Sequence, residues 1–410
     1  MRLAVSKSGP LVGSLRPSSD KSLTHRAYIF AALARSPSVV MEPLRGEDCE
    51  NTLRIFQQLG AATSPHPGEG VSISPPQSLR QQHDPLDCGN SGTTMRLLAG
   101  VIASEPRLRA TLVGDESLSR RPMRRITDPL RLMGADIEGD TAPLRIEGKR
   151  LRGIDYRSPV ASAQIKSCLL LAGLRAEGET WVTEPAQSRD HTERMLAALG
   201  IELLSRSDRA IGVRGGQSWD GFEFSVPSDI SSAAYFLCAA AIVPGSKVVL
   251  RSVGTNPTRT GVLEALADAG ALVEAAPGQE QMGEPVSHIA VVQVPGLQAF
   301  HVAGDLVPRL IDEIPVLAVL ATQCEGTTTI RDAGELRVKE SDRIETVASN
   351  LLAMGAQVET FADGLAVTGP TPLCGAVVDA QGDHRIGMAF AVAGLVAEGE
   401  TQILNADSIR

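Results

Sequence analysis

The chain has 410 residues, of which 43% are hydrophobic and 21% charged, so it has the composition of a globular protein that is too long for one compact core. Its formal net charge of −9 and its aromatic content of 3% argue against nucleic acid or a membrane surface as a general partner. An anionic ligand would therefore need a local site built for it.

Neither a membrane span nor a targeting segment is predicted. No apolar run reaches the roughly 18 residues that a transmembrane helix needs, and the N-terminal sequence lacks the apolar core of a signal peptide. The six cysteines form no C-x-x-C pair and most lie in apolar stretches, which favours buried free thiols over disulfides or zinc ligands. We therefore expect a cytoplasmic protein.

A first helical pattern recurs six times, about every 70 residues. Each copy has small polar residues, then an Ala/Leu-rich helix, then a turn and a β-branched strand. Because these helices are apolar nearly all round, we expect them to be buried. The copies lie at 20–41, 91–113, 161–182, 229–250, 312–330 and 383–404.

A second helical pattern lies between the copies of the first. It is amphipathic, so we expect it to pack on the outside, and it closes with a glycine of the kind that ends helices. Its copies lie at 52–63, 126–137, 192–203, 262–273 and 347–358.

Together the two patterns predict an α/β fold with two domains, each built from three βαβαββ units. The segment before Ser18 has a short strand pattern but no helix, and we expect it to complete the C-terminal half. The predicted domains are 1–17 with 228–410, and 18–227. The chain would then cross between them near 15–20 and 226–229.

The starts of the first helices carry Asp, Ser or Thr, which are N-cap residues. If the three buried helices of a domain run parallel, the positive ends of their dipoles share one face, and two facing domains would focus them on an anion site in the inter-domain cleft. Basic residues collect at the same places. For each one a solvated side chain is the alternative; their coincidence at equivalent positions favours a site. They are Lys21, Arg26, Arg96, Lys166 and Arg385, with a cluster of Arg120, Arg121, Arg124 and Arg125.

The stretch RVKESDRIETV at 337–347 is unusually dense in charge. As a solvated helix start it would be held by Lys339–Asp342 and Glu340–Arg343 pairs at i,i+3 spacing. As a wall of the anion site, the helix would present Lys339 and Arg343 on one face, with Glu340 about 100° away. The basic residues at the other helix starts favour the second interpretation, a wall of the anion site.

Seven segments, taken in order, resemble the signatures of the 5-enolpyruvylshikimate-3-phosphate synthase family (3-phosphoshikimate 1-carboxyvinyltransferases). They are DKSLTHRA, NSGTTMR, RRPM, SAQIKS, DEIPVLAV, KESDRI and DHRIGMA, and the resemblance extends over essentially the whole chain. It implies the fold predicted above, closing on a cleft. It also implies transfer of the enolpyruvyl group of phosphoenolpyruvate to the 5-hydroxyl of shikimate 3-phosphate, in the route to chorismate and the aromatic amino acids, without a metal or an organic cofactor.

The resemblance also implies binding residues for both substrates. Shikimate 3-phosphate would lie on the 18–227 domain side and phosphoenolpyruvate on the other. For shikimate 3-phosphate the implied residues are Lys21, Ser22, Arg26, Ser162, Ala163, Gln164, Arg189, Asp312 and Lys339. For phosphoenolpyruvate they are Lys21, Gly92, Arg121, Gln164, Arg343 and Arg385, the last two as bidentate clamps.

The implied reaction is an addition followed by an elimination, which needs acid–base groups in a dry site. We assign Asp312 to accept the 5-hydroxyl proton, and Glu340 with Lys21 to handle the proton at C3 of phosphoenolpyruvate; Lys339 is a further candidate. Asp312 also has the place of a helix N-cap and could serve in both ways. For His384, support of Glu340 or Arg385 and a purely structural role remain open.

Several positions depart from the family pattern. Ala163 offers only its backbone N–H, Leu97 stands where many relatives have proline, and Arg189 replaces a tyrosine found in some relatives. Family members usually run on past the position of Arg410. We further expect a monomer that glyphosate inhibits, because Gly92 leaves room for a phosphonate.

Two alternative functions fit the sequence less well. A sister enolpyruvyl transferase acting on UDP-N-acetylglucosamine carries a reactive cysteine in the loop matching 114–123, where this chain has none. A noncatalytic repeat scaffold would not need Lys, Arg, Asp and Glu together at its helix starts.

Overall fold

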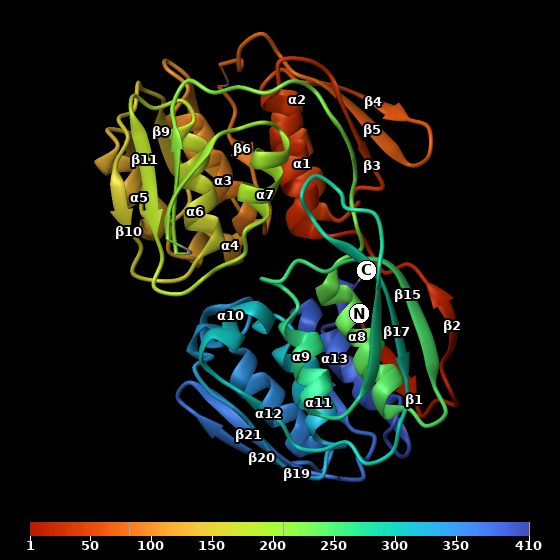
Figure 1. Ribbon diagram of the computed structural model, residues 1–410. Helices are drawn as coiled ribbons and strands as arrows, with labels where there is room; N and C mark the ends of the chain where they lie inside the picture. The colour runs from red at the N-terminus through yellow and green to blue at the C-terminus, as the bar shows by residue number, and fades with distance from the viewer. Residues whose placement is uncertain (82, 208, 410) are drawn as a thin grey trace. The chain divides into compact units, whose positions relative to one another are not determined.

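The computed structural model describes residues 1–81, 83–207 and 209–409. The chain divides into two compact units (Figure 1). The first, called here the 19–227 unit, consists of Ser19–Pro227 together with Glu280–Glu284. The second, the 228–410 unit, consists of Met1–Ser18, Ser228–Gln279 and the residues from Pro285 onward. No pattern in the sequence predicts that 280–284 joins the first unit.

Three repeats follow one another in the 19–227 unit. The first contains α1 (Lys21–Leu33), β3 (Ser38–Met41), α2 (Glu47–Gln58), β4 (Ala62–His66) and β5 (Gly70–Ser74). The second contains β6 (Leu86–Asp87), α3 (Gly92–Ala103), β7 (Arg109–Val113), α4 (Glu116–Arg120), α5 (Arg124–Leu132), β8 (Asp136–Glu138) and β9 (Leu144–Glu147). The third contains β10 (Asp155–Arg157), α6 (Ala163–Gly173), β11 (Glu179–Thr183), α7 (His191–Ala198), β12 (Leu203–Ser207) and β13 (Ala210–Arg214).

Each repeat of this unit forms a four-stranded sheet with the same topology. With β14 (Glu223–Ser225) included, the strand orders are β6-β7-β9-β8, β10-β11-β13-β12 and β14-β3-β5-β4. In every sheet the first two strands are parallel and the other neighbours antiparallel. In the first repeat the parallel edge strand is β14 (Glu223–Ser225), which comes from the end of the unit and closes it on itself.

The 228–410 unit has this architecture in its first two repeats, whereas the third repeat belongs to a three-stranded sheet and has one α-helix in the described residues. Its first repeat contains α8 (Ile230–Ile242), β15 (Lys247–Gly254), α9 (Gly261–Asp268), β16 (Leu272–Pro277) and β17 (Val286–Val292). The second contains β18 (His301–Val302), η1 (Gly304–Leu306), α10 (Val307–Leu310), α11 (Ile314–Ala321), β19 (Gly326–Ile330), η2 (Gly334–Val338), α12 (Arg343–Ala353), β20 (Gln357–Phe361) and β21 (Gly364–Gly369). The third contains β22 (Val377–Asp379), α13 (His384–Gly394), β23 (Glu400–Leu404) and η3 (Asp407–Ile409).

The N-terminal segment completes two sheets of this unit. Strand β1 (Leu3–Ser6) pairs antiparallel with β23, and β2 (Val12–Leu15) pairs parallel with β15. The resulting strand orders are β1-β23-β22, β16-β17-β15-β2 and β18-β19-β21-β20. The segment before Ser18 thus adds one strand to each of two sheets whose other strands come from the C-terminal half of the chain.

The two helical patterns have the burial that their periodicity predicts. The first helices α1, α3, α6, α8, α11 and α13 supply much of the two hydrophobic cores, one in each unit. In α1 every residue from Leu23 to Ala32 is buried. The second helices are one-sided: α2 buries Leu53 and Phe56 but leaves Arg54 and Gln57 exposed. An apolar surface all round thus places a helix in the centre, and an apolar stripe places it outside.

Side chains cap most of the first helices. The N-cap side chains of Asp20, Ser91, Ser162, Asp229 and Asp383 each accept a backbone N–H of their own helix. Helix α11 differs, because its N-cap is Glu313 and makes no such bond. The prediction that Asp312 caps this helix is therefore wrong, and its carboxylate is available for other contacts.

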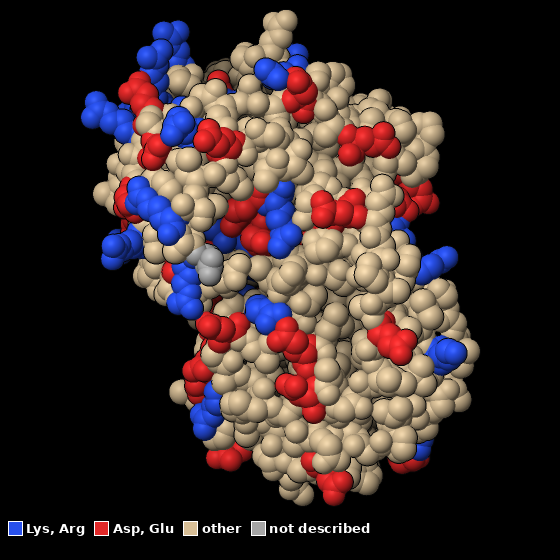
Figure 2. Space-filling model, viewed as in Figure 1, with Lys and Arg blue, Asp and Glu red and all other residues tan. Residues whose placement is uncertain are grey.

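The burial of the cysteines and the distribution of surface charge agree in most respects with what the composition predicts. Five cysteines are buried free thiols, whereas Cys374 is exposed, against expectation. On the face shown in Figure 2, basic and acidic side chains are interspersed. Among the helices of the described residues, none combines the length and the apolar character that crossing a bilayer requires.

Gly100 sets the distance between two buried helices of the 19–227 unit. A Cβ on this residue of α3 would lie 2.3 Å from the backbone carbonyl oxygen of Cys168 in α6. Gly100→Ala should therefore force the helices apart and lower stability by about 1–3 kcal/mol. Thermal unfolding measures this, with Gly9→Ala as control, because a Cβ at Gly9 meets nothing within 4 Å. Equal midpoints for the two variants would contradict the packing argument.

Candidate active site

The first turns of α1, α3 and α6 meet in the 19–227 unit. Gln164, at the start of α6, donates its amide to the Thr93 hydroxyl of α3 at 3.0 Å and accepts from the Arg96 guanidinium. Arg26 of α1 donates to the Ser167 hydroxyl of α6 at 2.8 Å. The helix starts therefore lie together, so the positive ends of three helix dipoles point at a common region.

Arg26 is a buried cation whose hydrogen-bond acceptors are neutral. Its Nε donates to Thr192 Oγ1 at 2.8 Å, its Nη2 to Ser167 Oγ and its Nη1 to the Ser22 carbonyl at 3.0 Å. Burial lowers the pKa of Arg26 to about 10, although the Glu193 carboxylate acts in the opposite direction. The side chain thus stays protonated at neutral pH, and an anionic ligand would compensate its charge directly.

The start of α3 brings two further guanidinium groups near a backbone N-terminus. Gly92 is the first residue of the helix, and a Cβ there would lie 2.9 Å from Arg96 Nη1 and 3.6 Å from Arg121 Nη1. Arg121 is held by a 2.7 Å hydrogen bond from its Nη2 to the Asn90 side-chain oxygen. Glycine therefore permits a close cationic approach at this helix end.

The other predicted residues of this unit lie at helix starts or in a nearby loop. Lys21 opens α1, and its amine pairs with the Asp48 carboxylate. Ser162 caps α6 and Ala163 begins it. Arg189 lies in the loop before α7, where its charge helps to lower the pKa of Arg26 behind the larger effect of burial.

Lys166 has a different role from the one its position suggested. Its amine is buried between two carboxylates, 2.8 Å from Glu184 Oε2 and 2.7 Å from Glu193 Oε1. Burial alone would lower its pKa, but the two carboxylates outweigh burial and raise it. Glu184 also accepts the Ser162 N–H at 2.9 Å, so this internal ion cluster steadies the start of α6.

In the 228–410 unit the starts of α8, α11 and α13 also meet. The Ser231 hydroxyl of α8 bonds the Glu313 carboxylate at the start of α11. Arg385 of α13 donates from Nη1 to the Asp312 carbonyl, just before α11, at 3.3 Å. The two units thus share one structural feature, which is a set of first helices whose first turns converge.

Arg343, the first residue of α12, is enclosed by carboxylates. Its Nε lies 2.8 Å from Asp383 Oδ2, its Nη2 lies 2.6 Å from Glu340 Oε2, and its side chain is 1% exposed. Burial would lower the pKa of Arg343, but Glu340 and Asp383 outweigh burial and raise it. Asp383, fully buried, also caps α13 through the Arg385 N–H and accepts the Ser341 hydroxyl at 3.1 Å.

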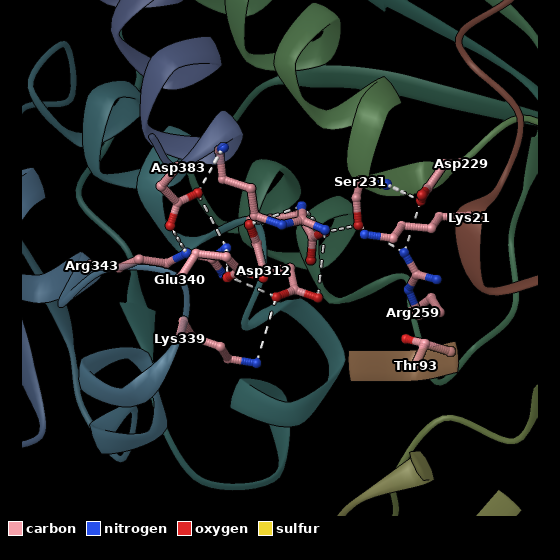
Figure 3. Close-up of polar contacts among 12 residues, drawn as sticks. Lys21, Thr93, Asp229, Ser231, Arg259, Asp312, Lys339, Glu340, Arg343 and Asp383 are labelled. Carbon is pink, nitrogen blue, oxygen red and sulfur yellow. Dashed lines mark hydrogen bonds and ion pairs between the residues drawn. The ribbon is translucent and has the colours of Figure 1, made fainter. Parts of the chain in front are cut away.

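A single carboxylate faces three cations in this cluster (Figure 3). Asp312 lies 3.3 Å from Arg343 Nη1, 3.7 Å from Arg385 Nη2 and 3.8 Å from Lys339 Nζ. Burial would lower the pKa of Arg385, but Asp312 and other neighbours raise it well above its usual value. The predicted residues of this unit therefore come together, although they are drawn from three separate segments.

The charged stretch 337–347 is not one helix. Helix η2 ends at Val338, α12 begins at Arg343, and Lys339 and Glu340 lie in the nonhelical link between them. The prediction that Lys339 and Arg343 share a helix face is therefore wrong, as is the Lys339–Asp342 pair. The predicted Glu340–Arg343 pair is confirmed.

Asp342 explains why the helix begins late. Its side chain accepts the Glu345 N–H at 3.1 Å as the N-cap of α12 and pairs with Arg337 at 2.8 Å. An aspartate that caps a helix cannot also lie inside it, so the residues before it leave the helical path.

Sequence reasoning missed three kinds of supporting residue. Asp383 had a detectable signal, because it stands in the N-cap place of DHRIGMA. No sequence signal marked Thr192 and Ser167, which accept hydrogen bonds from Arg26, or the buried Arg259. Within the described residues, no group of three or more His, Cys, Asp or Glu side chains is arranged to hold a metal ion.

Comparisons with known proteins agree over the whole chain. The sequence profile of the family EPSP synthase (3-phosphoshikimate 1-carboxyvinyltransferase) matches residues 5–410. The chain is 47% identical to the 3-phosphoshikimate 1-carboxyvinyltransferase of Brevibacillus brevis, over 99% of this chain and 96% of that protein. It is also 47% identical to the Bacillus subtilis protein of the same name, over 97% of this chain and 94% of that protein.

A solved structure gives the same result. The EPSP synthase of Acinetobacter baumannii matches with a TM-score of 0.90 and 41% identity, covering 100% of this chain and 95% of that one. These likenesses favour the expected enolpyruvyl transfer over both the UDP-N-acetylglucosamine transferase and the repeat scaffold.

Asp383 should be a major contributor to stability. Asp383→Asn leaves Arg343 buried with less compensating charge and should lower the free energy of unfolding by about 3 kcal/mol. Asp220→Asn is a matched control, because Asp220 also accepts two bonds from one arginine, Arg35, but at an exposed site. Urea denaturation of both variants tests this. A loss for Asp383→Asn no larger than that for Asp220→Asn would contradict it.

Proposed function

We propose a division of work among the residues of this chain, which belongs to the EPSP synthase (3-phosphoshikimate 1-carboxyvinyltransferase) family. As a member of that family it transfers the enolpyruvyl group of phosphoenolpyruvate to the 5-hydroxyl of shikimate 3-phosphate and releases phosphate, in aromatic amino acid biosynthesis. The observation that carries the proposal is the cluster in which Asp312 faces Lys339, Arg343 and Arg385.

The residues assigned to shikimate 3-phosphate centre on Arg26. Its buried guanidinium, with neutral acceptors on three nitrogens, is suited to an anionic group of this substrate. The converging helix starts add unpaired N–H groups for other oxygens. The full proposed set is Lys21, Ser22, Arg26, Ser162, Ala163, Gln164, Arg189, Asp312 and Lys339.

For phosphoenolpyruvate, the geometry supports unequal roles for the two arginines. Arg343 directs its Nε and Nη2 to Asp383 and Glu340, so much of its bonding capacity is used within the protein. Arg385 lies 3.7 and 3.9 Å from the nearest carboxylate oxygens of Asp312 and Glu313, which is too long for a charge-assisted hydrogen bond. We therefore assign the bidentate clamp to Arg385, with Arg343 contributing through Nη1. Lys21, Gly92, Arg121 and Gln164 complete the set.

The reaction follows from these assignments. In the addition, the 5-hydroxyl oxygen bonds to C2 of phosphoenolpyruvate, its proton passes to Asp312, and C3 receives a proton from Glu340 or Lys21. In the elimination, C3 returns a proton to that pair, the C2–C3 double bond re-forms, and the C2–O bond to phosphate breaks. Lys339 Nζ lies 3.8 Å from Asp312 Oδ1, close enough to help position this carboxylate. Neither a metal nor a cofactor is part of this proposal.

Separate kinetic constants for the two substrates test the division. Arg26→Met should raise KM for shikimate 3-phosphate about 100-fold, and Arg385→Met should do so for phosphoenolpyruvate, because each removes charge-assisted bonds to one ligand. Arg35→Met, at an exposed pair, should change neither constant. Phosphate release with both substrates present is the assay. Variants that raise the two KM values in parallel would refute the division.

Inhibition by glyphosate is also part of the proposal, together with a monomeric state and a cytoplasmic location. A Cβ at Gly92 would enter the space beside Arg96 and Arg121. Glyphosate should therefore compete with phosphoenolpyruvate, and Gly92→Ala should raise its inhibition constant at least several-fold more than it raises KM for phosphoenolpyruvate. A wild-type enzyme that resists high glyphosate, with no change in Gly92→Ala, would rule out this use of Gly92.

A further inference from the structure

A second buried ion cluster adjoins Arg385 in the 228–410 unit. At its centre is Arg259, which lies between β15 and α9 and whose side chain is 2% exposed. Its Nη2 donates to Asp229 Oδ1 at 2.8 Å and to Ser231 Oγ at 2.7 Å. Arg259 is not among the residues predicted from the sequence, and the proposed mechanism does not use it.

The Ser231 hydroxyl forms hydrogen bonds with both Arg259 and Glu313 and so links the two side chains. A hydroxyl has one proton to donate. Because Ser231 Oγ accepts a bond from Arg259, its proton is directed to the Glu313 carboxylate, with which it makes a hydrogen bond. Figure 3 shows Ser231 beside Arg259 and Asp229 at the start of α8.

Glu313 connects this cluster to the substrate clamp. The residue is 1% exposed, and its Oε1, the atom that accepts from Ser231, lies 3.9 Å from Arg385 Nη1. A buried carboxylate next to a guanidinium gains most by closing to about 2.8 Å. The bond from Ser231 fixes this oxygen 3.9 Å from Arg385 Nη1, and the positive charge of Arg259 offsets part of the attraction.

We propose that Arg259 is a positioning residue that acts through Ser231 to hold the Glu313 carboxylate back from Arg385. The Arg385 N–H groups are thereby kept available for the carboxylate or phosphate of phosphoenolpyruvate. This inference rests on the proposed assignment of Arg385 to that substrate. Without Arg259, Glu313 would turn to Arg385 and compete with the substrate as an internal anion.

Arg259 also has a structural contact, which the experiment must separate from this role. It pairs with Asp229, the N-cap of α8, whose Oδ1 accepts the Ser231 N–H at 2.8 Å. Ser231→Ala removes the link to Glu313 while leaving the Arg259–Asp229 pair in place. It therefore tests the relay even if Arg259→Met fails to fold.

The experiment measures KM for each substrate in the full-length enzyme. Arg259→Met should raise KM for phosphoenolpyruvate about tenfold, with KM for shikimate 3-phosphate unchanged, and Ser231→Ala should act in the same direction. Glu313→Gln removes the competing charge, so in Arg259→Met/Glu313→Gln and Ser231→Ala/Glu313→Gln the first substitution should add little to the KM of Glu313→Gln alone.

Arg309→Met is the matched control. Arg309 donates to the Pro257 carbonyl at 2.9 Å and so steadies the same loop, but it pairs with Glu264 at 3.0 Å and not with Ser231 or Glu313 in the described structure. It should change neither KM.

Two results would overturn the inference: parallel rises of both KM values in Ser231→Ala, or no suppression by Glu313→Gln. Arg385→Met separates this failure from that of the proposed function. If that variant leaves KM for phosphoenolpyruvate unchanged, the assignment of Arg385 is wrong; if it raises KM while Arg259→Met and Ser231→Ala do not, only the positioning role is wrong.

Discussion

Within each unit the chemistry depends on the convergence of buried helix starts. Apolar helices must lie in the centre of the unit, and the repeated topology brings their first turns together. Each start carries unpaired N–H groups and a positive dipole end, so a cation placed there is unfavourable unless an anion compensates it. The charged residues of this protein are arranged around that constraint.

The two units meet the constraint in different ways. Around Arg26, neutral hydroxyl and carbonyl oxygens hold a buried cation without cancelling its charge. Around Arg343, carboxylates alternate with cations, so the charge is largely balanced inside the protein. A ligand gains Coulomb energy directly at the first site, whereas at the second it must compete with internal carboxylates. That difference is why the spacing of Glu313 and Asp312 from Arg385 matters.

The sequence was sufficient to predict the repeats, because helical periodicity and closing glycines are local signals. It also predicted that Asp312, Glu340, Arg343 and Arg385 belong to one cluster, through their places at equivalent helix starts and through the family resemblance. It could not predict what each charge touches. Lys166 looked like a ligand-binding residue but is paired with Glu184 and Glu193, which are distant in sequence.

Other errors have the same cause. The pattern at 337–347 suited a continuous helix, yet Asp342 prefers to cap α12, which places Lys339 and Glu340 outside it. No sequence pattern marked Arg259, because its partners Asp229 and Ser231 lie 30 and 28 residues earlier in the chain. Pairings between side chains on different helices and loops of a repeat depend on tertiary packing, which periodicity does not encode.

A crystal structure with shikimate 3-phosphate and glyphosate bound tests the central claim most directly. We predict an anionic oxygen of shikimate 3-phosphate within hydrogen-bond distance of Arg26, whose bonds to Ser167 and Thr192 persist. We also predict two bonds from Arg385 to glyphosate while Arg343 remains on Asp383. Ligands bound away from Arg26 and Arg385, or an Arg343 that leaves Asp383 to make the bidentate contact, would contradict the account.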